Sequence, residues 1–402
     1  MSRGRITVVG LDGRPLDEGI ERLLAKAALV AGGGRHLEIL GVHRDRAVVL
    51  EADLSEALAR IEDTEGPVVV LASGDPGFFG IVRLLGERFR REDLRVLPGL
   101  SSVALAFARA GLSWEDAVTV SAHGRDPRRA VNVCRAHPKV AVLTSPDFGP
   151  AELAEALGGL DRTFVIAEKL GEADERVFHG DAGTVAGMEW EDPNVVLVFD
   201  ERRMPGARGW ISSGIVAQGR WALSEQEFEH QSGMITKSAT RAFVLSRLGP
   251  GRGDLIWDVG AGSGSVAIEC ARLGAAAIAI ERDPERCARI RRNAEHHGVR
   301  LQIMEAMAPE TLRDLPEPDA VFVGGSGGAF EEIVKLSAVR TLRSVVLALV
   351  TLERVVPASQ LLEDCGLEVE TTFLQTSRMK GVGNLHRLAA ESTAFVVSGS
   401  RT

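Results

Sequence analysis

The sequence predicts an α/β protein built from two consecutive domains. Short apolar runs rich in β-branched residues alternate with segments whose apolar residues recur every three or four positions. Residues 200–233 interrupt this alternation with a mixture of Pro, Gly, Ser and charged residues. A chain of 402 residues is long for one hydrophobic core and comfortable for two. We therefore predict domains at 1–205 and 206–402.

Each half has its own series of predicted elements. In the first half we expect strands at 6–10, 67–73, 94–99, 139–145 and 194–200, and helices at 16–29, 54–61 and 101–110. In the second half we expect strands at 254–260, 275–281, 300–305, 319–324 and 344–350, and helices at 237–248, 266–273 and 284–297. The last two strands, 367–376 and 393–399, are expected to pair antiparallel.

The composition is that of a globular protein with an acidic balance. The chain is 45% hydrophobic and 26% charged, with a formal net charge of -9, which argues against a general nucleic-acid or acidic-membrane binder. No apolar run reaches the ~20 residues that span a bilayer, and the first residues do not resemble a secretory signal. We expect a cytoplasmic protein without a metal site, because its four cysteines lack metal-ligand spacing and are typical of free thiols: Cys134, Cys270, Cys287 and Cys365.

The most specific local pattern is Asp-Val-Gly-Ala-Gly-Ser-Gly at 258–264, between a predicted strand and a predicted helix. Glycines there allow a tight turn and close approach to a ligand, and the next helix presents free N–H groups. A dinucleotide-binding fold would have its third glycine at position 265, which is Ser265. The pattern instead resembles motif I of class I methyltransferases, which implies that this loop holds the amino-acid end of S-adenosylmethionine through Gly260, Ala261, Gly262, Ser263 and Gly264.

Further positions extend this resemblance. Glu281 ends the next strand, where a carboxylate can accept hydrogen bonds from both ribose hydroxyls of the cofactor; the alternative is a solvated acid at a strand end. In class I methyltransferases the loop after the third strand flanks the adenine, so the resemblance implies that Met307 and Ala308 bind the cofactor there. Many relatives carry Asp or Asn at the position of Met307, so backbone groups would have to contact the adenine amino group.

Two features point to a narrower group of methyltransferases. Thr236 and Lys237 precede the predicted helix 237–248, and a Gly-Gly-Ser-Gly-Gly loop ends the strand 319–324. This combination resembles the C-terminal domain of corrin-pathway methyltransferases. The resemblance implies that Thr236 borders the cofactor and that the glycine-rich loop lies at the substrate cleft, through Gly324, Gly325, Ser326 and Gly327. A flexible loop is the alternative for these glycines.

Three turns with glycine follow strands in the first half, at 10–13, 73–80 and 97–102. The Ser-Gly-Asp-Pro-Gly of the second is by itself an ordinary turn signal. Together with Ser-Ala-His-Gly-Arg at 121–125, the three resemble the tetrapyrrole methylase family, class III methyltransferases that bind S-adenosylmethionine between two small α/β lobes. The first turn is Gly-Leu-Asp-Gly where many relatives have Gly-x-Gly-Pro-Gly. The resemblance implies cofactor contacts at Gly10, Gly74, Asp75, Gly77, Ser101 and Ser102.

Three side chains are candidates for catalysis. His123 could orient the substrate or move a proton near neutral pH, and a structural role is its alternative. Arg125 begins a basic cluster that could bind substrate carboxylates or could be a solvated helix start. Lys237 is the third candidate, with surface solubility as its alternative.

The resemblance covers both halves of the chain. It implies a two-lobed class III tetrapyrrole methylase domain followed by a Rossmann-like class I methyltransferase domain. The implied activity is methylation of a precorrin at carbon 5 by the first domain and at carbon 15 by the second, with S-adenosylmethionine as cofactor. The second domain would also decarboxylate the ring C acetate, giving precorrin-8 in cobalamin biosynthesis. Expected partners are the precorrin and further copies of the chain, without nucleic acid or membrane.

Other functions stay open at this point. The chain could methylate a different tetrapyrrole, or bind a tetrapyrrole without catalysis. A dehydrogenase is disfavoured by the position of Gly264, and an RNA methyltransferase by the acidic balance and the absence of an Asn-Pro-Pro-aromatic motif.

Overall fold

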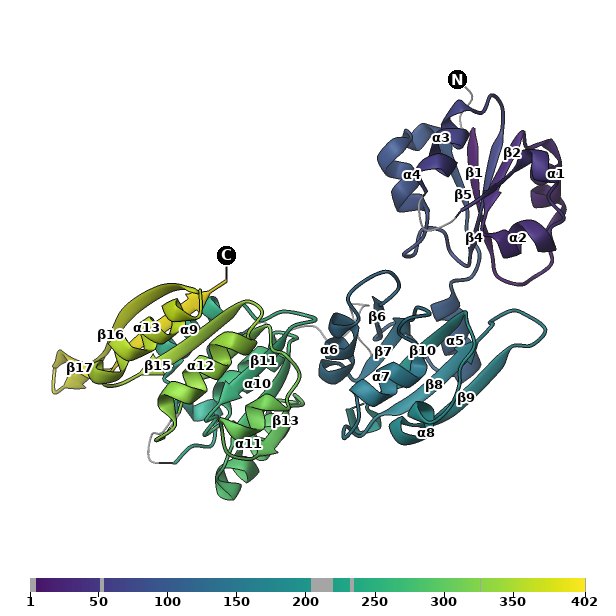
Figure 1. The fold of residues 1–402 in the computed structure, drawn as a ribbon. Coiled ribbons are helices and arrows are strands. Elements are labelled where there is room, and N and C mark those ends of the chain that lie inside the picture. The colour runs from purple at the N-terminus through teal and green to yellow at the C-terminus, as the bar shows by residue number, and fades with distance from the viewer. Residues whose placement is uncertain (1–4, 51–53, 204–219, 232–234, 326, 402) are drawn as a thin grey trace. The chain divides into compact units, whose positions relative to one another are not determined.

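The computed structural model describes residues 5–50, 54–203, 220–231, 235–325 and 327–401. It divides into unit 1, Met1–Pro127 with Lys139–Ser213, and unit 2, Arg128–Pro138 with Gly214–Thr402. Figure 1 shows the elements of each unit. The predicted domain boundary at 205/206 lies outside the described residues.

Unit 1 begins with a lobe built on a parallel sheet. Its strand order is β3-β2-β4-β1-β5, and every pairing is parallel. The strands are β1 (Ile6–Leu11), β2 (Leu29–Gly32), β3 (Ala47–Val49), β4 (Val68–Ser73) and β5 (Leu94–Leu97). The helices are α1 (Glu18–Lys26), α2 (Gly34–Ile39), α3 (Ser55–Asp63) and α4 (Val82–Arg88). Parallel strands need such crossover helices, which bury the valine-rich sheet on both faces.

The second lobe of unit 1 has a mixed sheet. Its order is β6-β7-β10-β8-β9; β6 and β7 are parallel, and the other neighbours are antiparallel. The strands are β6 (Val118–Ser121), β7 (Lys139–Leu143), β8 (Thr163–Glu168), β9 (Arg176–Asp181) and β10 (Asn194–Phe199). The helices of this lobe are α5 (Ser102–Ala110), α7 (Pro150–Ala156) and α8 (Ala182–Ala186).

Unit 2 is a Rossmann-like domain with the strand order β13-β12-β11-β14-β15-β17-β16. The first five strands of that order are parallel, and the last two add an antiparallel hairpin. The strands are β11 (Leu255–Val259), β12 (Ala276–Glu281), β13 (Gln302–Glu305), β14 (Ala320–Val323), β15 (Ser344–Leu349), β16 (Glu368–Val382) and β17 (Leu385–Ser400). The helices are α6 (Arg128–Ala136), α9 (Ser238–Leu248), α10 (Ser265–Arg272), α11 (Pro284–His296), α12 (Phe330–Arg340) and α13 (Val355–Asp364).

This topology fixes where a ligand can bind in unit 2. The chain order reverses between β11 and β14, which are neighbours in the sheet. In open α/β sheets the ligand cleft forms at the carboxyl ends of the strands at such a reversal. The glycine-rich loop 260–264 follows β11 and the loop 324–328 follows β14, so both lie at this edge.

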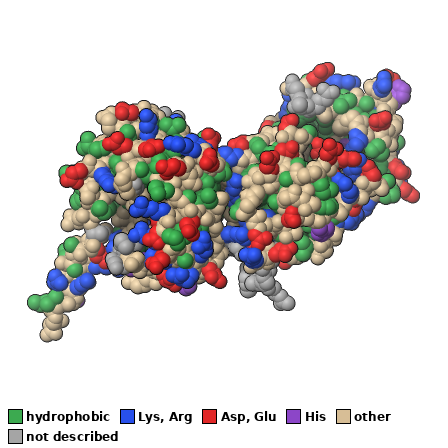
Figure 2. Space-filling view, turned by 60° about the horizontal axis from the view of Figure 1, so that its bottom comes forward, with side chains coloured by type: hydrophobic (Ala, Val, Ile, Leu, Met, Phe, Trp, Pro, Cys, Tyr) green, Lys and Arg blue, Asp and Glu red, His purple; other side chains and the backbone are tan. Residues whose placement is uncertain are grey.

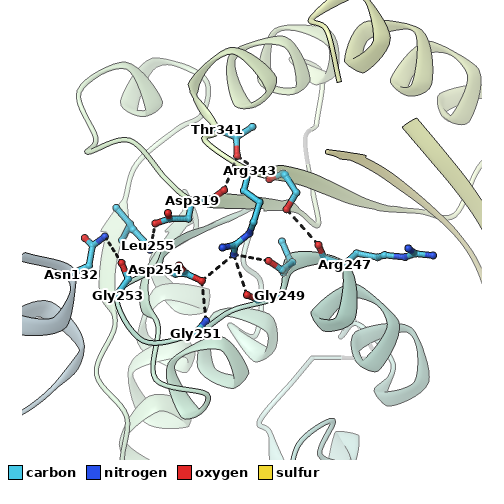
Figure 3. A network of polar contacts seen from close by, with 12 residues as sticks. Asn132, Arg247, Gly249, Gly251, Gly253, Asp254, Leu255, Asp319, Thr341 and Arg343 are labelled. Atoms are coloured by element: carbon cyan, nitrogen blue, oxygen red, sulfur yellow. Dashed lines mark hydrogen bonds and ion pairs between the residues drawn. The ribbon is translucent and has the colours of Figure 1, made fainter. Parts of the chain in front are cut away.

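The opposite edge of the unit 2 sheet is held by a polar network (Figure 3). Arg343 donates hydrogen bonds to the carboxylate of Asp254 at 3.0 Å and to two backbone carbonyl oxygens at 2.8 and 3.1 Å. Asp319 accepts a hydrogen bond from the Leu255 N–H at 2.8 Å, and Asn132 of α6 donates to a carbonyl oxygen in the turn before β11 at 3.1 Å. These contacts fix the starts of the central strands and leave their carboxyl ends free.

The expected strands and helices are present, and two differences have a physical cause. Residues 220–231, expected as part of a connection, belong to unit 2, because Leu223 and Phe228 are buried in a cluster with Ile268 and Ala294. The final antiparallel pair is longer than expected, since β16 and β17 stay paired as far as Val382 and Leu385. Apolar side chains of this arm are exposed, and Figure 2 shows acidic and basic side chains interspersed over the visible face of the protein.

Candidate active sites

Unit 1 contains a cavity of about 830 Å³, called here the unit 1 cavity. The turns after β1, β4 and β6 line it, together with residues of β7, β8 and β10 or next to them, so both lobes contribute walls. Its size is that of a pocket for a small-molecule ligand. Of the predicted contacts in this half, Gly74, Ser102, His123 and Arg125 line the unit 1 cavity.

The other predicted residues of this half lie in the turns behind the cavity wall. A Cβ atom on Gly10 would lie 2.0 Å from the Gly74 carbonyl oxygen, so only glycine lets the two turns touch. Asp75 accepts a hydrogen bond from the Gly77 N–H at 2.8 Å, and Ser101 caps α5 by accepting one from a backbone N–H at 3.1 Å. Their contacts shape the turns, and a direct cofactor contact stays a prediction for these residues.

Asp12 is a residue of this cavity that sequence reasoning missed. Its carboxylate accepts a hydrogen bond from the Leu100 N–H at 2.9 Å and pairs with Arg14 at 2.5 Å. The Arg14 side chain and the Leu100 N–H lower the pKa of Asp12 to about 2, so the carboxyl group is ionised at neutral pH. Asp12 therefore fixes the turn after β1 against the turn after β5.

His36 and Ser73 form a second unpredicted pair on the cavity wall. The His36 Nε2 atom lies 3.2 Å from the Ser73 Oγ atom. Burial lowers the pKa of His36, with a smaller effect from the neighbouring Arg35 cation, so the ring is neutral at physiological pH. His36 lies in α2, seven residues beyond the helix predicted at 16–29, and a lone histidine there gives no sequence signal for this contact.

In unit 2, the loop 260–264 leaves β11 in a conformation that requires glycine. Gly260 has φ +71°, and a Cβ atom there would lie 2.2 Å from the Gly325 carbonyl oxygen. Gly264 has φ +73° and packs against Ile290 of α11. The loop is therefore pressed against the loop after β14 on one side and against α11 on the other.

Glu281 is buried and holds this loop in place. Its Oε2 atom accepts a hydrogen bond from the Gly262 N–H at 2.9 Å, and its Oε1 atom accepts from the N–H groups of Arg282 and Asp283 at 3.0 and 3.1 Å. An ionised carboxylate has about four acceptor positions. Three are used within the chain, so about one is left for a ligand hydroxyl.

Asp258, the acidic residue before the loop, is completely buried. Its Oδ2 atom accepts a hydrogen bond from the Ala267 N–H at 3.0 Å, whereas Oδ1 has no partner among the described residues. Burial raises the pKa of Asp258 to about 7, and the nearby Glu281 charge adds to the increase. A buried oxygen atom without a partner next to a ligand loop is a position where a ligand or a water molecule can donate.

A second cavity, of about 200 Å³, lies at this edge of the unit 2 sheet and is called the unit 2 cavity. The predicted residues that line it are Gly260, Glu281, Met307, Ala308, Gly325 and Gly327. Met307 is 58% exposed, so its side chain is free to move against a ligand. Arg282 and Arg286 also line the cavity and were not predicted.

The remaining predicted residues of unit 2 have other surroundings. Gly324 donates a hydrogen bond to the Val259 carbonyl oxygen at 3.0 Å, and Ser326 lies outside the described residues. Ala261, Ser263, Thr236 and Lys237 are not among the residues that line the unit 2 cavity. Thr236 and Lys237 both accept hydrogen bonds from Arg241 through their carbonyl oxygens, at 2.6 and 2.7 Å. Their roles in binding or catalysis stay predictions.

Comparison with known proteins gives the family. Residues 14–186 match the tetrapyrrole (corrin/porphyrin) methylases, and residues 226–398 match a precorrin methyltransferase domain. A Sinorhizobium protein named precorrin-6Y C(5,15)-methyltransferase [decarboxylating] is 40% identical over 357 residues, which are 84% of this chain and 82% of that protein. The chain belongs to the precorrin-6Y C(5,15)-methyltransferase (decarboxylating) family.

Two shorter relatives each match 44% of this chain. A Pyrobaculum calidifontis protein named as a probable cobalt-precorrin-6B C(15)-methyltransferase (decarboxylating) is 33% identical, and the match covers 94% of it. A Salmonella typhimurium protein named cobalt-precorrin-7 C(5)-methyltransferase is 36% identical, and the match covers 88% of it. The two activities in the family name thus also occur in the names of separate, shorter proteins.

No helix among the described residues is long and apolar enough to cross a bilayer. The same residues contain no cluster of His, Cys, Asp and Glu that could hold a metal ion, and the four cysteines are free thiols.

Proposed function

We propose that this protein transfers methyl groups from S-adenosylmethionine to carbons 5 and 15 of precorrin-6Y and removes carbon dioxide from the ring C acetate. Unit 1 carries out the carbon-5 methylation, and unit 2 the carbon-15 methylation and the decarboxylation. The observation that carries the proposal is the pairing of two different cavities with two different family matches on one chain.

The residues of unit 2 fit an S-adenosylmethionine molecule. Gly262 has no side chain, and a Cβ atom there would have no neighbour closer than 4.0 Å, so a ligand can approach the loop closely at this residue. The buried Oδ1 atom of Asp258 has no partner among the described residues, and Glu281 has about one acceptor position left. An amino group and a ribose hydroxyl are the kinds of donor that these two carboxylates accept.

The cofactor, when bound, supplies a methyl group on a positively charged sulfur atom, which an electron-rich carbon can take without a strong base. The protein therefore has to orient the acceptor carbon in line and exclude water. In unit 2, Gly325 and Gly327 leave room at the cleft for a bulky macrocycle. Arg282 and Arg286 line this cavity and can pair with its carboxylates, and Arg286 also lies 3.6 Å from the carboxylate of Asp283.

In unit 1, four arginine side chains line the cavity: Arg14, Arg35, Arg83 and Arg125. A precorrin carries many carboxylate side chains, so a cavity with several guanidinium groups suits it despite the acidic balance of the whole chain. The family match over residues 14–186 supports a cofactor site in the same unit. Gly74 and Ser102 are the predicted cofactor residues that line this cavity.

Incubation with precorrin-6Y and methyl-labelled S-adenosylmethionine under anaerobic conditions tests the proposal. Mass analysis of the product should find two labelled methyl groups and one carboxyl group fewer. Recovery of unlabelled and unchanged precorrin-6Y would contradict methyl transfer and favour a protein that binds a tetrapyrrole without catalysis. If a different tetrapyrrole is labelled and precorrin-6Y stays unchanged, the assignment of precorrin-6Y as the substrate is wrong. The predicted homo-oligomer is tested separately by light scattering.

A further inference from the structure

Four exposed apolar side chains are among the residues that line the unit 1 cavity. Among its lining residues, Ile39, Phe78, Phe79 and Leu100 are 71%, 37%, 50% and 45% exposed. Single exposed apolar side chains are ordinary, but four around one cavity form a surface that a ligand can cover. The rings of Phe78 and Phe79 contact each other edge to face, with their centroids 5.0 Å apart.

Phe79 adopts a backbone conformation that is unfavourable for it. Its φ is +56°, in the left-handed region where a bulky side chain is strained. The next residue, Gly80, packs so tightly on this turn that a Cβ atom there would lie 2.4 Å from the Pro76 carbonyl oxygen. The turn therefore holds an exposed aromatic ring at the cavity at a cost in backbone strain. Such strain is concentrated at functional sites, because folding alone would favour glycine at this position.

Arg125 comes from the other lobe and meets this ring. Its guanidinium carbon lies 5.8 Å from the centroid of the Phe79 ring. Among the other arginines that line the cavity, Arg14, Arg35 and Arg83 are paired with carboxylates of the chain. Arg125 has no ion pair among the described residues, so its charge is available to a carboxylate of a ligand.

From these contacts we propose that Phe79 and Arg125 together recognise the substrate of unit 1. The Phe79 ring packs against the conjugated macrocycle, and the Arg125 guanidinium binds one of its carboxylate side chains. Both are binding and positioning residues and neither exchanges a proton with the substrate. This inference rests on the proposed function, since it assigns a role to two residues within the carbon-5 methylation.

A merely structural role for Phe79 gives opposite expectations for stability. If the ring supports the fold, Phe79→Gly lowers the melting temperature of unit 1. If the ring serves the ligand, Phe79→Gly relieves the backbone strain, and the melting temperature is unchanged or higher while substrate recognition is lost. Phe79→Leu removes the ring and keeps an apolar side chain, and Trp114→Leu is a control at another exposed aromatic residue of unit 1.

The test measures carbon-5 methylation of precorrin-6Y by the full-length chain as a function of both substrates. In Phe79→Leu and Arg125→Gln, we expect the KM for the precorrin to rise at least about tenfold, the KM for S-adenosylmethionine to change less than about twofold, and Arg125→Lys to recover part of the loss. Product with a methyl group only at carbon 15 should accumulate, because unit 2 is untouched.

Three results would overturn the inference: a precorrin KM in both variants equal to that of Trp114→Leu, an equal rise in the KM for S-adenosylmethionine, or a lower melting temperature in Phe79→Gly. A wild-type chain that methylates no precorrin would instead refute the proposed function itself. The two failures are therefore distinguishable in one set of measurements.

Discussion

Glu281→Gln tests how unit 2 is built, because the substitution keeps the shape of the side chain and removes its charge. The carboxylate accepts three backbone N–H groups, at 2.9, 3.0 and 3.1 Å. A glutamine has one acceptor oxygen, and its NH₂ group must face a donor. If this oxygen keeps the hydrogen bonds from the Arg282 and Asp283 N–H groups, the hydrogen bond from the Gly262 N–H is lost. A hydrogen bond to a charged acceptor contributes roughly 1.5–3 kcal/mol.

The other two bonds also weaken as the charge is lost, so we expect unit 2 to lose about 2–4 kcal/mol in the absence of ligand. For a domain of this size, that lowers the melting temperature by on the order of 5–10 °C. The variant also loses the remaining acceptor position and the ordered loop, which should weaken S-adenosylhomocysteine binding at unit 2 about 10- to 100-fold.

Calorimetric titration and thermal denaturation of the full chain measure both effects. Glu285→Gln is the matched control, because it makes the same change at an exposed position of the next helix. Binding at unit 1 should be the same in both variants. The contradicting result is that Glu281→Gln and Glu285→Gln have equal melting temperatures and bind S-adenosylhomocysteine equally well at unit 2. The Glu281 carboxylate would then neither hold the loop nor contact the cofactor, and the proposed cofactor site in unit 2 would be wrong.

Two further predictions concern buried charges in unit 2. Since burial raises the pKa of Asp258 to about 7 from 3.8, folding takes up a proton between about pH 4 and pH 7, and stability falls as pH rises through this window. In Asp258→Asn, the free energy of unfolding in urea should no longer fall with rising pH in the ligand-free protein. A fall of the same slope in this variant would show that Asp258 does not cause it. Arg241→Met removes one of the two cations paired with the fully buried Glu269, since Arg272 remains 3.5 Å from its carboxylate, and should destabilise unit 2 by up to about 3–5 kcal/mol. Adding Glu269→Gln should restore part of this loss, and an Arg241→Met variant as stable as wild type would refute it.

The elements with strong local signals could be predicted from the sequence. The valine-rich runs became β4 and β10, and the glycines of 260–264 lie in the turn between β11 and α10 as expected. These features depend on side chains and backbone preferences that are local in sequence. The short strands β2 and β3 were not separated from their surroundings, because runs of three or four residues have too little periodicity to detect.

Contacts between distant residues could not be predicted. Asp12 meets Leu100 only because β1 and β5 are neighbours in the sheet, and nothing near Asp12 indicates this partner. Arg241 is completely buried against Glu269, which lies 28 residues further along the chain. The sequence indicated that Glu281 binds the ribose of the cofactor. It did not indicate that the Glu281 carboxylate also holds the loop through the Gly262 N–H. The strained φ of Phe79 likewise depends on how its turn is packed.

We infer that one chain has two cofactor sites of different architecture. Titration of the full-length chain with S-adenosylhomocysteine by isothermal calorimetry tests it most directly. We expect two molecules bound per chain in the wild type and, in Glu281→Gln, one site unchanged and one weakened. Saturation at one molecule per chain, with both units folded, would contradict it.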